Sequence, residues 1–437
     1  MDLASTTALL TDHYELTMLQ GALHSGTASR RAVFEVFARH LPNGRRYGVV
    51  AGTGRLLDAL ESYVFDEPTL EFLTSHEIVD EGTAEWLSKY RFSGDIVGYA
   101  EGDCYFPGSP ILRVEAPFGE AVLLETLVLS ILNHDCAIAS AASRMVHAAG
   151  DRPIIEMGSR RTHEMAAVAS ARAAYIAGFT TTSNLEAGRR YGVPTAGTSA
   201  HAFTLLHDSE RHAFRAQLDS AGRGTTLLVD TYDVERAVRM AVELAGPELG
   251  AVRLDSGDPA VVSRDVRQLL DSLGATQTRI VVTGDLDEFL IAGLAVAPVD
   301  GYGVGTSLVT GSGAPTAALV YKLVARTDSP APDAPLRPVA KRSVGKPSKG
   351  GRKWAVRHID STGVARSELV TTGAPEEITG PHDREPMVPL LRAGKVVGRE
   401  SLDEARARHQ RTIQELPATA RQLSRGDPGI PTEFVTR

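Results

Sequence analysis

Short apolar stretches alternate with longer helix-like stretches from about residue 119 onward, and this alternation constrains the fold more than any other feature. The apolar stretches predict strands at 153–157, 179–183, 194–198, 225–230, 250–255, 279–284 and 300–305. Spacings of three and four residues predict helices at 120–132, 137–150, 162–178, 233–246 and 259–274. Regular alternation of strands and helices builds a parallel sheet, either closed as a barrel or doubly wound.

Polar residues and glycines cluster directly after the predicted strands. They are Arg160, Arg161, Asn184, His201, Asp230, Asp255, Gly284, Asp285, Thr306 and Ser307. A barrel gathers the carboxyl ends of all its strands at one mouth, whereas a doubly wound sheet spreads them along a crevice. We therefore expect an α/β fold with a parallel α/β barrel, in which these side chains converge.

The remainder of the chain has a different composition. Residues 1–118 mix predicted strands with helices, and residues 327–350 are rich in proline, serine and lysine. We expect an N-terminal α+β domain over 1–118, a barrel domain over 119–326, and a linker with a C-terminal segment over 327–437. The C-terminal segment is expected to complete the N-terminal domain.

Charge and cysteine content exclude several classes of protein. The formal net charge of −8 offers no basic excess for a nucleic-acid partner. The longest apolar stretch, 289–299, is too short to span a bilayer, and the N-terminus does not resemble a signal peptide. The two cysteines, Cys104 and Cys136, are too few for a disulfide framework or a four-cysteine zinc site. We expect a cytoplasmic protein with no metal held by its own side chains.

Two glycine-containing loops end the last two predicted strands, at 281–286 and 303–307. In phosphate-binding barrels the last two loops commonly hold a phosphate, because their backbone N–H groups can approach an anion closely. The alternative is a pair of tight turns without a ligand. Their joint position at the end of the barrel favours the phosphate site.

Charged residues follow or lie within several strands. Arg253 and Asp255 alternate onto one face of a strand, which predicts either a structural ion pair or a cation that binds an anion. Asp230 could bind a ribose hydroxyl or a magnesium-bound water, and Asp233 has the position of a helix N-cap. The basic stretch 341–353 is expected to be a flexible, solvated loop.

His201 follows a glycine and two hydroxyl residues in the stretch "GTSAHAF" at 197–203. A histidine in such a place is commonly buried or capping, with a satisfied hydrogen bond. At the mouth of a barrel rich in anion-binding loops, it is instead a candidate catalytic residue. From these residues we therefore expect a barrel that binds a substrate with several anionic groups.

Seven motifs, in order, resemble the nicotinate phosphoribosyltransferase family. They are "LLTDHYELTM", "EMGSRRTH", "GTSAHAF", "VDTYD", "VRLDSGD", "VTGDLDE" and "GVGTSLVTG". The resemblance covers residues 9–325 and implies an irregular α/β barrel with a mainly sheet-containing N-terminal domain, the type II phosphoribosyltransferase fold. It also implies a homodimer with shared active sites. The implied reaction joins nicotinate to phosphoribosyl pyrophosphate, with ATP hydrolysis, and yields nicotinate mononucleotide and pyrophosphate.

The resemblance also implies residue roles. His201 would be the phosphohistidine formed from ATP, and Arg253 and Asp255 would act with it as catalytic residues. Mg²⁺ would be carried by ATP and pyrophosphate. The implied substrate-binding residues are Tyr14 from the neighbouring subunit, Arg160, Ser183, Thr198, Gly284, Asp285, Gly305, Thr306 and Ser307.

Two positions depart from the family pattern, and three other functions stay open. Met157 stands where the family commonly has phenylalanine, and Ala202 where many members have glutamate. Ser183 stands where the related nicotinamide-using enzyme has an aspartate. The alternatives are that nicotinamide-using phosphoribosyltransferase, a phosphosugar aldolase or isomerase barrel, and a non-catalytic nucleotide-binding regulator. The strand ends named above offer no lysine for Schiff-base chemistry.

Overall fold

The computed structural model describes residues 6–341 and 348–435, which divide into two compact units. Unit 1 combines Met1–Ser140 with Ala314–Arg437, and unit 2 is Ala141–Gly313. The N-terminal and C-terminal parts of the chain therefore belong to one unit. The expected boundaries, after residues 118 and 326, differ from this division. Residues 342–347 of the predicted basic loop lie outside the described residues.

Unit 2 is built around a six-stranded parallel sheet in the order β7-β6-β11-β10-β9-β8. Each strand lies beside its successor in the chain except between β7 and β8, and β11 returns to lie beside β6. This is the order of a barrel that is open at one seam. In a doubly wound sheet, the order in which successive strands are added would instead reverse at a switch point. The predicted parallel α/β barrel is thus confirmed in an irregular, open form.

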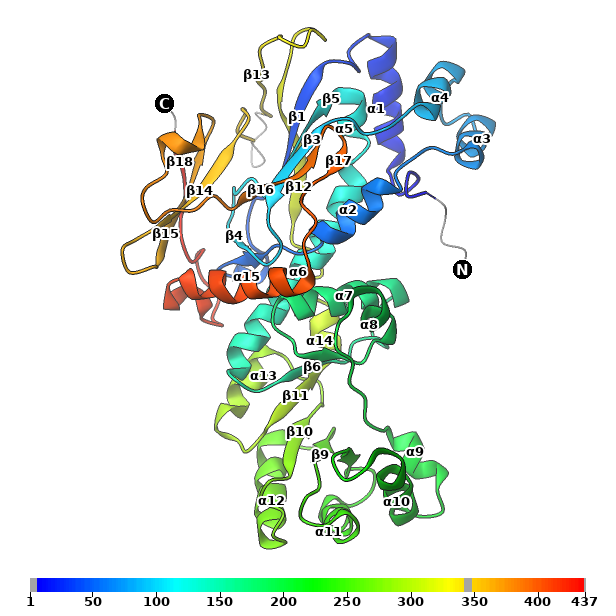
Figure 1. Ribbon diagram of the computed structural model, residues 1–437, viewed down its shortest axis with the longest axis vertical. Helices are drawn as coiled ribbons and strands as arrows, with labels where there is room; N and C mark the ends of the chain where they lie inside the picture. The colour runs from blue at the N-terminus through cyan, green and yellow to red at the C-terminus, as the bar shows by residue number, and fades with distance from the viewer. Residues whose placement is uncertain (1–5, 342–347, 436–437) are drawn as a thin grey trace. The chain divides into compact units, whose positions relative to one another are not determined.

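The strands of unit 2 are short. They are β6 (Ile154–Glu156), β7 (Thr181–Thr182), β8 (Thr226–Leu228), β9 (Ala251–Leu254), β10 (Arg279–Val282) and β11 (Gly301–Val304). Helices follow them in the chain and flank the sheet, as Figure 1 shows for α11, α12 and α13. The helices are α7 (Glu164–Ile176), α8 (Leu185–Tyr191), α9 (His201–Leu206), α10 (Glu210–Ala221), α11 (Val234–Ala245), α12 (Pro259–Ser272), α13 (Glu288–Gly293) and α14 (Thr306–Val309).

Two local predictions were wrong. The segment 194–198 is not a strand, and it contributes a single bridge between Thr195 and Thr182. The two helices expected at 120–132 and 137–150 are largely one helix, α6 (Glu125–Ala149), preceded by the short α5 (Phe118–Val122). The helix continues through its polar centre because Asp135 is buried there and paired with Arg55 at 2.7 Å.

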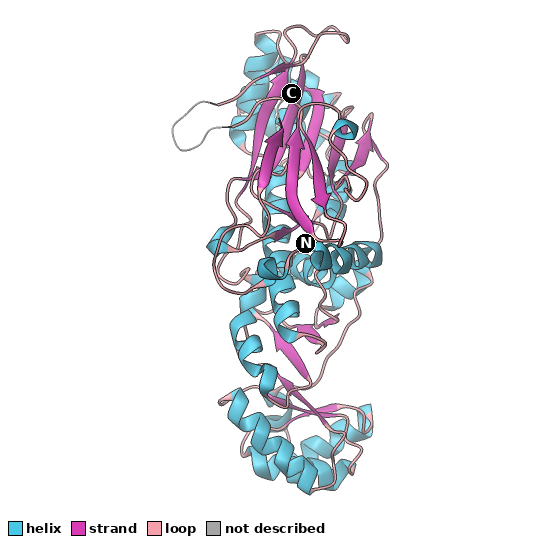
Figure 2. Ribbon diagram, turned by 90° about the vertical axis from the view of Figure 1, so that its left-hand side faces the viewer, coloured by secondary structure: helices cyan, strands magenta, loops and turns pink. Residues whose placement is uncertain are grey.

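Unit 1 is dominated by an antiparallel sheet of seven strands, and Figure 2 shows its longer strands. In spatial order the strands are β13 (Arg337–Pro338), β12 (Leu319–Arg326), β1 (Arg31–Ala38), β5 (Leu112–Pro117), β3 (Asp95–Tyr99), β16 (Met387–Arg392) and β17 (Lys395–Val396). Smaller sheets contain β14 (Trp354–Ile359), β15 (Ala365–Thr371) and β18 (Thr432–Val435), and β2 (Gly48–Val49) with β4 (Cys104–Tyr105). The main helices are α1 (His13–His24), α2 (Thr53–Glu61), α3 (Glu67–Ser75), α4 (Glu81–Ser88) and α15 (Leu402–Glu415).

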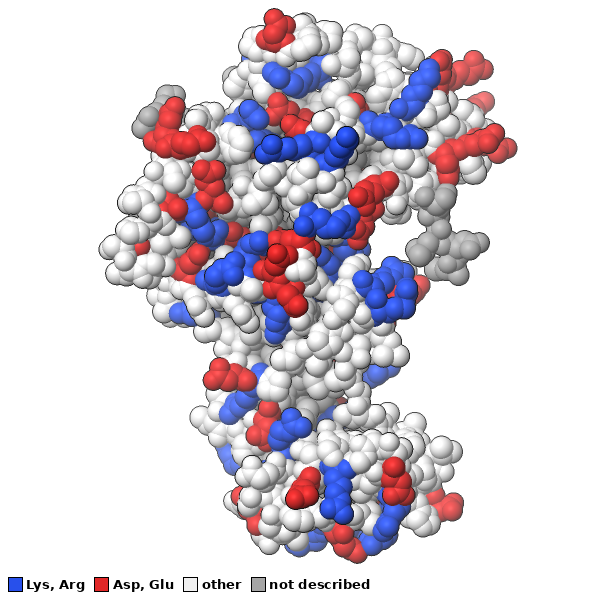
Figure 3. Space-filling view, viewed as in Figure 1, with Lys and Arg blue, Asp and Glu red and all other residues white. Residues whose placement is uncertain are grey.

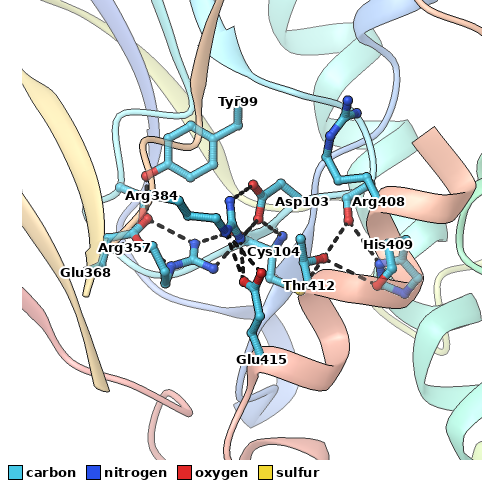
Figure 4. A network of polar contacts seen from close by, with 12 residues as sticks. Tyr99, Asp103, Cys104, Arg357, Glu368, Arg384, Arg408, His409, Thr412 and Glu415 are labelled. Atoms are coloured by element: carbon cyan, nitrogen blue, oxygen red, sulfur yellow. Dashed lines mark hydrogen bonds and ion pairs between the residues drawn. The ribbon is translucent and has the colours of Figure 1, made fainter. Parts of the chain in front are cut away.

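A buried polar network joins the C-terminal segment to the rest of unit 1 (Figure 4). The fully buried Arg357 of β14 donates to Glu368 of β15, and also to the carbonyl oxygen of Cys104 at 2.8 Å. Arg384 is paired with Asp103 and, at 2.8 Å, with Glu415 of α15. These ion pairs connect segments that lie far apart in the sequence, so the C-terminal residues are an integral part of unit 1.

Acidic and basic side chains are interspersed over the face seen in Figure 3, with no single basic field on it. This distribution agrees with the net charge of −8. Within the described parts of the chain, no helix combines the length and the apolar character that crossing a bilayer requires.

Candidate active site

His201 is the first residue of α9 in unit 2. The N-cap position of that helix belongs to Ala200, so His201 is not a capping residue, and its side chain is 41% exposed. Its Nδ1 lies 3.2 Å from the Thr231 hydroxyl, and its Nε2 lies 4.0 Å from Oδ2 of Asp255. The imidazole is therefore oriented by two loops and still accessible to a reactant. Thr231 and Asp255, rather than the apolar Ala202, are the residues placed to orient the imidazole.

The carboxylates of Asp230 and Asp255 are themselves held in place. Oδ2 of Asp230 accepts from the Asp255 backbone N–H at 2.9 Å and from the Ser256 hydroxyl at 2.7 Å. Asp255 in turn accepts from the Thr283 hydroxyl. Asp230 thus fixes the backbone of the loop that presents Asp255 to His201. Its second oxygen, Oδ1, is buried and has no hydrogen-bond partner among the described residues.

Arg253 on β9 does not form the structural ion pair that was one of the two expectations. Within the described ranges its guanidinium is not ion-paired with Asp255; it donates to the Thr198 hydroxyl, and its buried Nε has no partner. Burial lowers the pKa of the Arg253 guanidinium. The negative charges of Asp255 and Asp230 oppose this shift, and the positive charge of Arg160 adds to it. A partly desolvated cation with an unused N–H is well suited to bind an anion.

Glu156 is a buried acid beside the candidate site that the sequence analysis did not single out. This buried carboxylate at the end of β6 accepts from the Thr182 hydroxyl and, at 2.5 Å, from the Gly158 backbone N–H. Burial raises its pKa. Glu156 thereby joins the loop that carries the exposed Arg160 to the strand that precedes Ser183. The signal in the sequence was an acid inside an otherwise apolar strand, "PIIEM".

Ser183 follows β7 at the edge of the sheet. Its backbone N–H donates to the Glu156 carbonyl oxygen at 2.8 Å. Its hydroxyl is buried without a partner in the part of the chain that the structure describes. The next residue, Asn184, caps α8 and donates to the Ser159 hydroxyl at 3.0 Å. An unused hydroxyl on an ordered loop can bind a substrate oxygen.

The two predicted phosphate loops leave the neighbouring strands β10 and β11. Gly284 is required by a close approach, because a Cβ there would lie 2.5 Å from the Asp255 carbonyl oxygen. Asp285 has a left-handed φ of 39°, and Gly305 occupies the N-cap position of α14. Thr306 and Ser307 form the first turn of α14, where backbone N–H groups have no partner within the helix. Both loops therefore follow the carboxyl ends of two neighbouring strands, which is the arrangement that the predicted phosphate site requires.

Unit 2 contains every candidate residue except Tyr14. Tyr14 lies on α1 in unit 1 and is 43% exposed. Burial, followed by the charges of Glu125 and Glu15, raises its pKa to about 12, so the phenol is neutral at physiological pH. Met157 packs against β11. A Cβ atom added to Gly303 of that strand would lie only 2.7 Å from the Met157 sulfur. Asp233 accepts from the Arg236 backbone N–H at 2.8 Å and is a helix cap, as predicted.

Comparison with protein families and solved structures supports the motif-based resemblance. The family model for the nicotinate phosphoribosyltransferase N-terminal domain matches residues 9–133, and that for the quinolinate phosphoribosyl transferase C-terminal domain matches residues 138–312. Human nicotinic acid phosphoribosyltransferase has a TM-score of 0.82 at 25% identity, covering 97% of this chain and 98% of its own. A nicotinate-nucleotide pyrophosphorylase from Pyrococcus furiosus shares the fold with a TM-score of 0.77 at 23% identity, covering 95% and 97%.

Two curated relatives from Mycobacterium tuberculosis extend this likeness to the sequence. One nicotinate phosphoribosyltransferase is 59% identical over 98% of this chain and 95% of its own length. A second enzyme of the same name is 40% identical over 95% and 89%. The two alignments extend along almost the whole chain, so they include both units and the C-terminal segment. The chain therefore belongs to the nicotinate phosphoribosyltransferase family.

Proposed function

We propose that the chain joins nicotinate to phosphoribosyl pyrophosphate and forms nicotinate mononucleotide and pyrophosphate. The observation that carries this proposal is Arg253, a half-buried cation with an unused N–H on the strand next to β10. The two glycine loops follow β10 and its other neighbour, β11. A pyridine carboxylate and a sugar phosphate are both anions, and the site offers separate groups for each. Family membership supports the same reaction.

The chemistry needs positioning more than covalent help. The pyridine nitrogen of nicotinate attacks C1 of the ribose, the bond from C1 to the pyrophosphate oxygen breaks, and pyrophosphate leaves with the electron pair. Arg253, Thr198 and Ser183 hold the pyridine carboxylate. The ribose 5-phosphate binds to Gly284, Asp285, Gly305, Thr306 and Ser307, and Arg160 faces the leaving pyrophosphate. Fixed donors that meet developing charge contribute most of the rate enhancement in such a site.

ATP is proposed to act through His201. A ring nitrogen of His201 attacks the γ-phosphorus, ADP leaves, and hydrolysis of the phosphohistidine later releases inorganic phosphate. Asp255, 4.0 Å from Nε2, stabilises the ring while it carries the phosphoryl group. Mg²⁺, carried by ATP and pyrophosphate, would neutralise phosphate charge.

We further propose that the enzyme is a cytoplasmic homodimer in which Tyr14 completes the site of the neighbouring subunit. The exposed ring of Tyr14, on a helix of unit 1, supports a contribution to a pyridine site formed by unit 2 of another chain. Its neutral phenol would stack on the pyridine ring without opposing the carboxylate.

Arg253→Ala is expected to weaken nicotinate binding by about 1.5–3 kcal/mol, the range for hydrogen bonds to charged groups, or about 10- to 150-fold in KM. Arg253→Lys is the matched variant and should recover only part of the loss, because it keeps the charge but not the planar fork. Steady-state kinetics with nicotinate as the varied substrate measure both. An unchanged KM together with lowered thermal stability would show that Arg253 is structural.

The choice of pyridine tests the proposed function. With phosphoribosyl pyrophosphate and Mg-ATP held constant, kcat/KM for nicotinate should exceed that for nicotinamide by about 100-fold, since only nicotinate places a charged acceptor against Arg253. Quinolinate, which carries a second carboxylate, should be a poor substrate. Comparable turnover of nicotinamide or quinolinate would contradict the assignment of nicotinate as the substrate.

A further inference from the structure

The turn after α14 has an unusual backbone. Gly311, Ser312 and Gly313 follow one another with left-handed φ values of 59°, 49° and 77°. The two glycines adopt this conformation freely, whereas a residue with a Cβ is strained in it. A serine between two glycines in such a turn points to a use for its hydroxyl.

Ser312 makes two hydrogen bonds that account for its presence. Its hydroxyl donates to Oε2 of Glu288 at 2.7 Å, and its backbone N–H donates to the Ser307 carbonyl oxygen at 2.7 Å. Glu288 is only 2% exposed, and its other oxygen, Oε1, accepts from Nε of Arg144 at 3.1 Å. A chain of contacts, buried at Arg144 and Glu288 and partly buried at the serines, therefore runs from Arg144 through Glu288 and Ser312 to Ser307.

This chain joins the two loops at the ends of β10 and β11. Glu288 is the first residue of α13, directly after the loop that contains Gly284 and Asp285. Ser312 lies in the turn after α14, the short helix that contains Thr306 and Ser307 and follows the glycine loop of β11. The strands underneath are paired over only two residue positions, from Val281 to Val282. The hydrogen bond from Ser312 to Glu288 is thus a second tie between the loops, beyond the end of the paired strands.

We propose that Glu288 and Ser312 are positioning residues for the site of the ribose 5-phosphate. They hold the two loops at a fixed separation, so that N–H groups from both loops meet one phosphate. Arg144 keeps the Glu288 carboxylate directed toward Ser312. This inference rests on the proposed function, because it assigns the purpose of the tie to phosphoribosyl pyrophosphate.

Ser312→Ala removes the hydroxyl and keeps the Cβ. The expected result is a rise of about 10-fold in KM for phosphoribosyl pyrophosphate, the lower end for the loss of an outer supporting contact, with KM for nicotinate unchanged within about two-fold. Ser312→Gly removes the same hydroxyl and also relieves the left-handed strain. It should be at least as stable as Ser312→Ala to heat, yet show the same rise in KM.

Glu288→Gln keeps one oxygen that can accept from Nε of Arg144, and its amide NH2 can donate to the Ser312 hydroxyl, so it should raise this KM less than Ser312→Ala does. Ser272→Ala is the control, because its hydroxyl donates to the Leu269 carbonyl oxygen at 2.7 Å at the exposed end of α12, and no KM should change. If KM rises only in the variants that lose thermal stability, or rises equally for both substrates, the contact is merely structural and the inference is wrong. Wild-type enzyme assayed in parallel separates this outcome from a failure of the proposed function, which would leave no mononucleotide in any sample.

Discussion

Replacing Arg357 with methionine is expected to destabilise unit 1 by about 3–5 kcal/mol, the cost of leaving a buried charge without its partner. The Arg357 side chain is 0% exposed, and its loss would leave the equally buried Glu368 without its cation (Figure 4). Asp103 would keep Arg384 and lose only a second, longer contact of 3.6 Å to Arg357. The unpaired Glu368 carboxylate therefore accounts for most of the expected loss.

Thermal and denaturant unfolding of the full chain measure this effect. Arg366→Met is the matched control, because Arg366 on the same small sheet pairs with Asp360 at the surface, where its side chain is 56% exposed. Exposed pairs contribute about 0–1 kcal/mol, so the control should unfold close to wild type. Equal stability of the two variants would show that the network does not hold the C-terminal segment in place.

The largest expected effect on chemistry comes from His201→Ala. With γ-labelled ATP, the wild-type protein should acquire an acid-labile phosphate, and this variant should acquire none. Transfer of the phosphoribosyl group to nicotinate should continue slowly and without dependence on ATP, because Arg253 and the glycine loops still position both substrates. Acid-quenched labelling and an assay with and without ATP measure the two parts of this prediction.

His207→Ala is the control for that experiment. His207 follows the last residue of the same helix, α9, and its Nδ1 contacts the Phe203 carbonyl oxygen at 2.8 Å. Loss of an imidazole there should leave the labelling intact. Full labelling of His201→Ala, or loss of labelling in the His207 variant alone, would show that the phosphorylated residue is not His201.

The barrel could be predicted from the sequence because the strands of unit 2 are short, apolar and separated by helices. Six of the seven expected strands exist, and they are neighbours in one sheet. The polar residues that follow them therefore lie at the carboxyl ends of neighbouring strands, as anticipated. The exception, 194–198, has the composition of a strand, but only Thr195 lies beside a partner strand. The residue pattern within a segment does not reveal whether another strand lies beside it to accept its hydrogen bonds. The continuous α6 was missed for a related reason, since the buried pairing of Asp135 with Arg55 depends on a distant segment.

The site was only partly predictable for the same physical reason. The sequence pointed to His201, Arg253 and the glycine loops, because each stands directly after or within a predicted strand, although the segment before His201 is not a strand in the structure. Their supporting contacts come from other loops: Thr231 beside His201, and Glu156 beneath the loop of Arg160. A supporting residue is recognised by what it touches, and neither its type nor its spacing indicates this in one sequence.

The most direct test of the account is a phosphorus NMR time course of the wild-type protein with nicotinate, phosphoribosyl pyrophosphate and Mg-ATP. The signals of phosphoribosyl pyrophosphate should fall while those of nicotinate mononucleotide and pyrophosphate rise together, with ADP and inorganic phosphate appearing in parallel. Omitting ATP should slow the reaction and remove the last two products. If phosphoribosyl pyrophosphate persists and no mononucleotide forms with or without ATP, the proposed function is wrong.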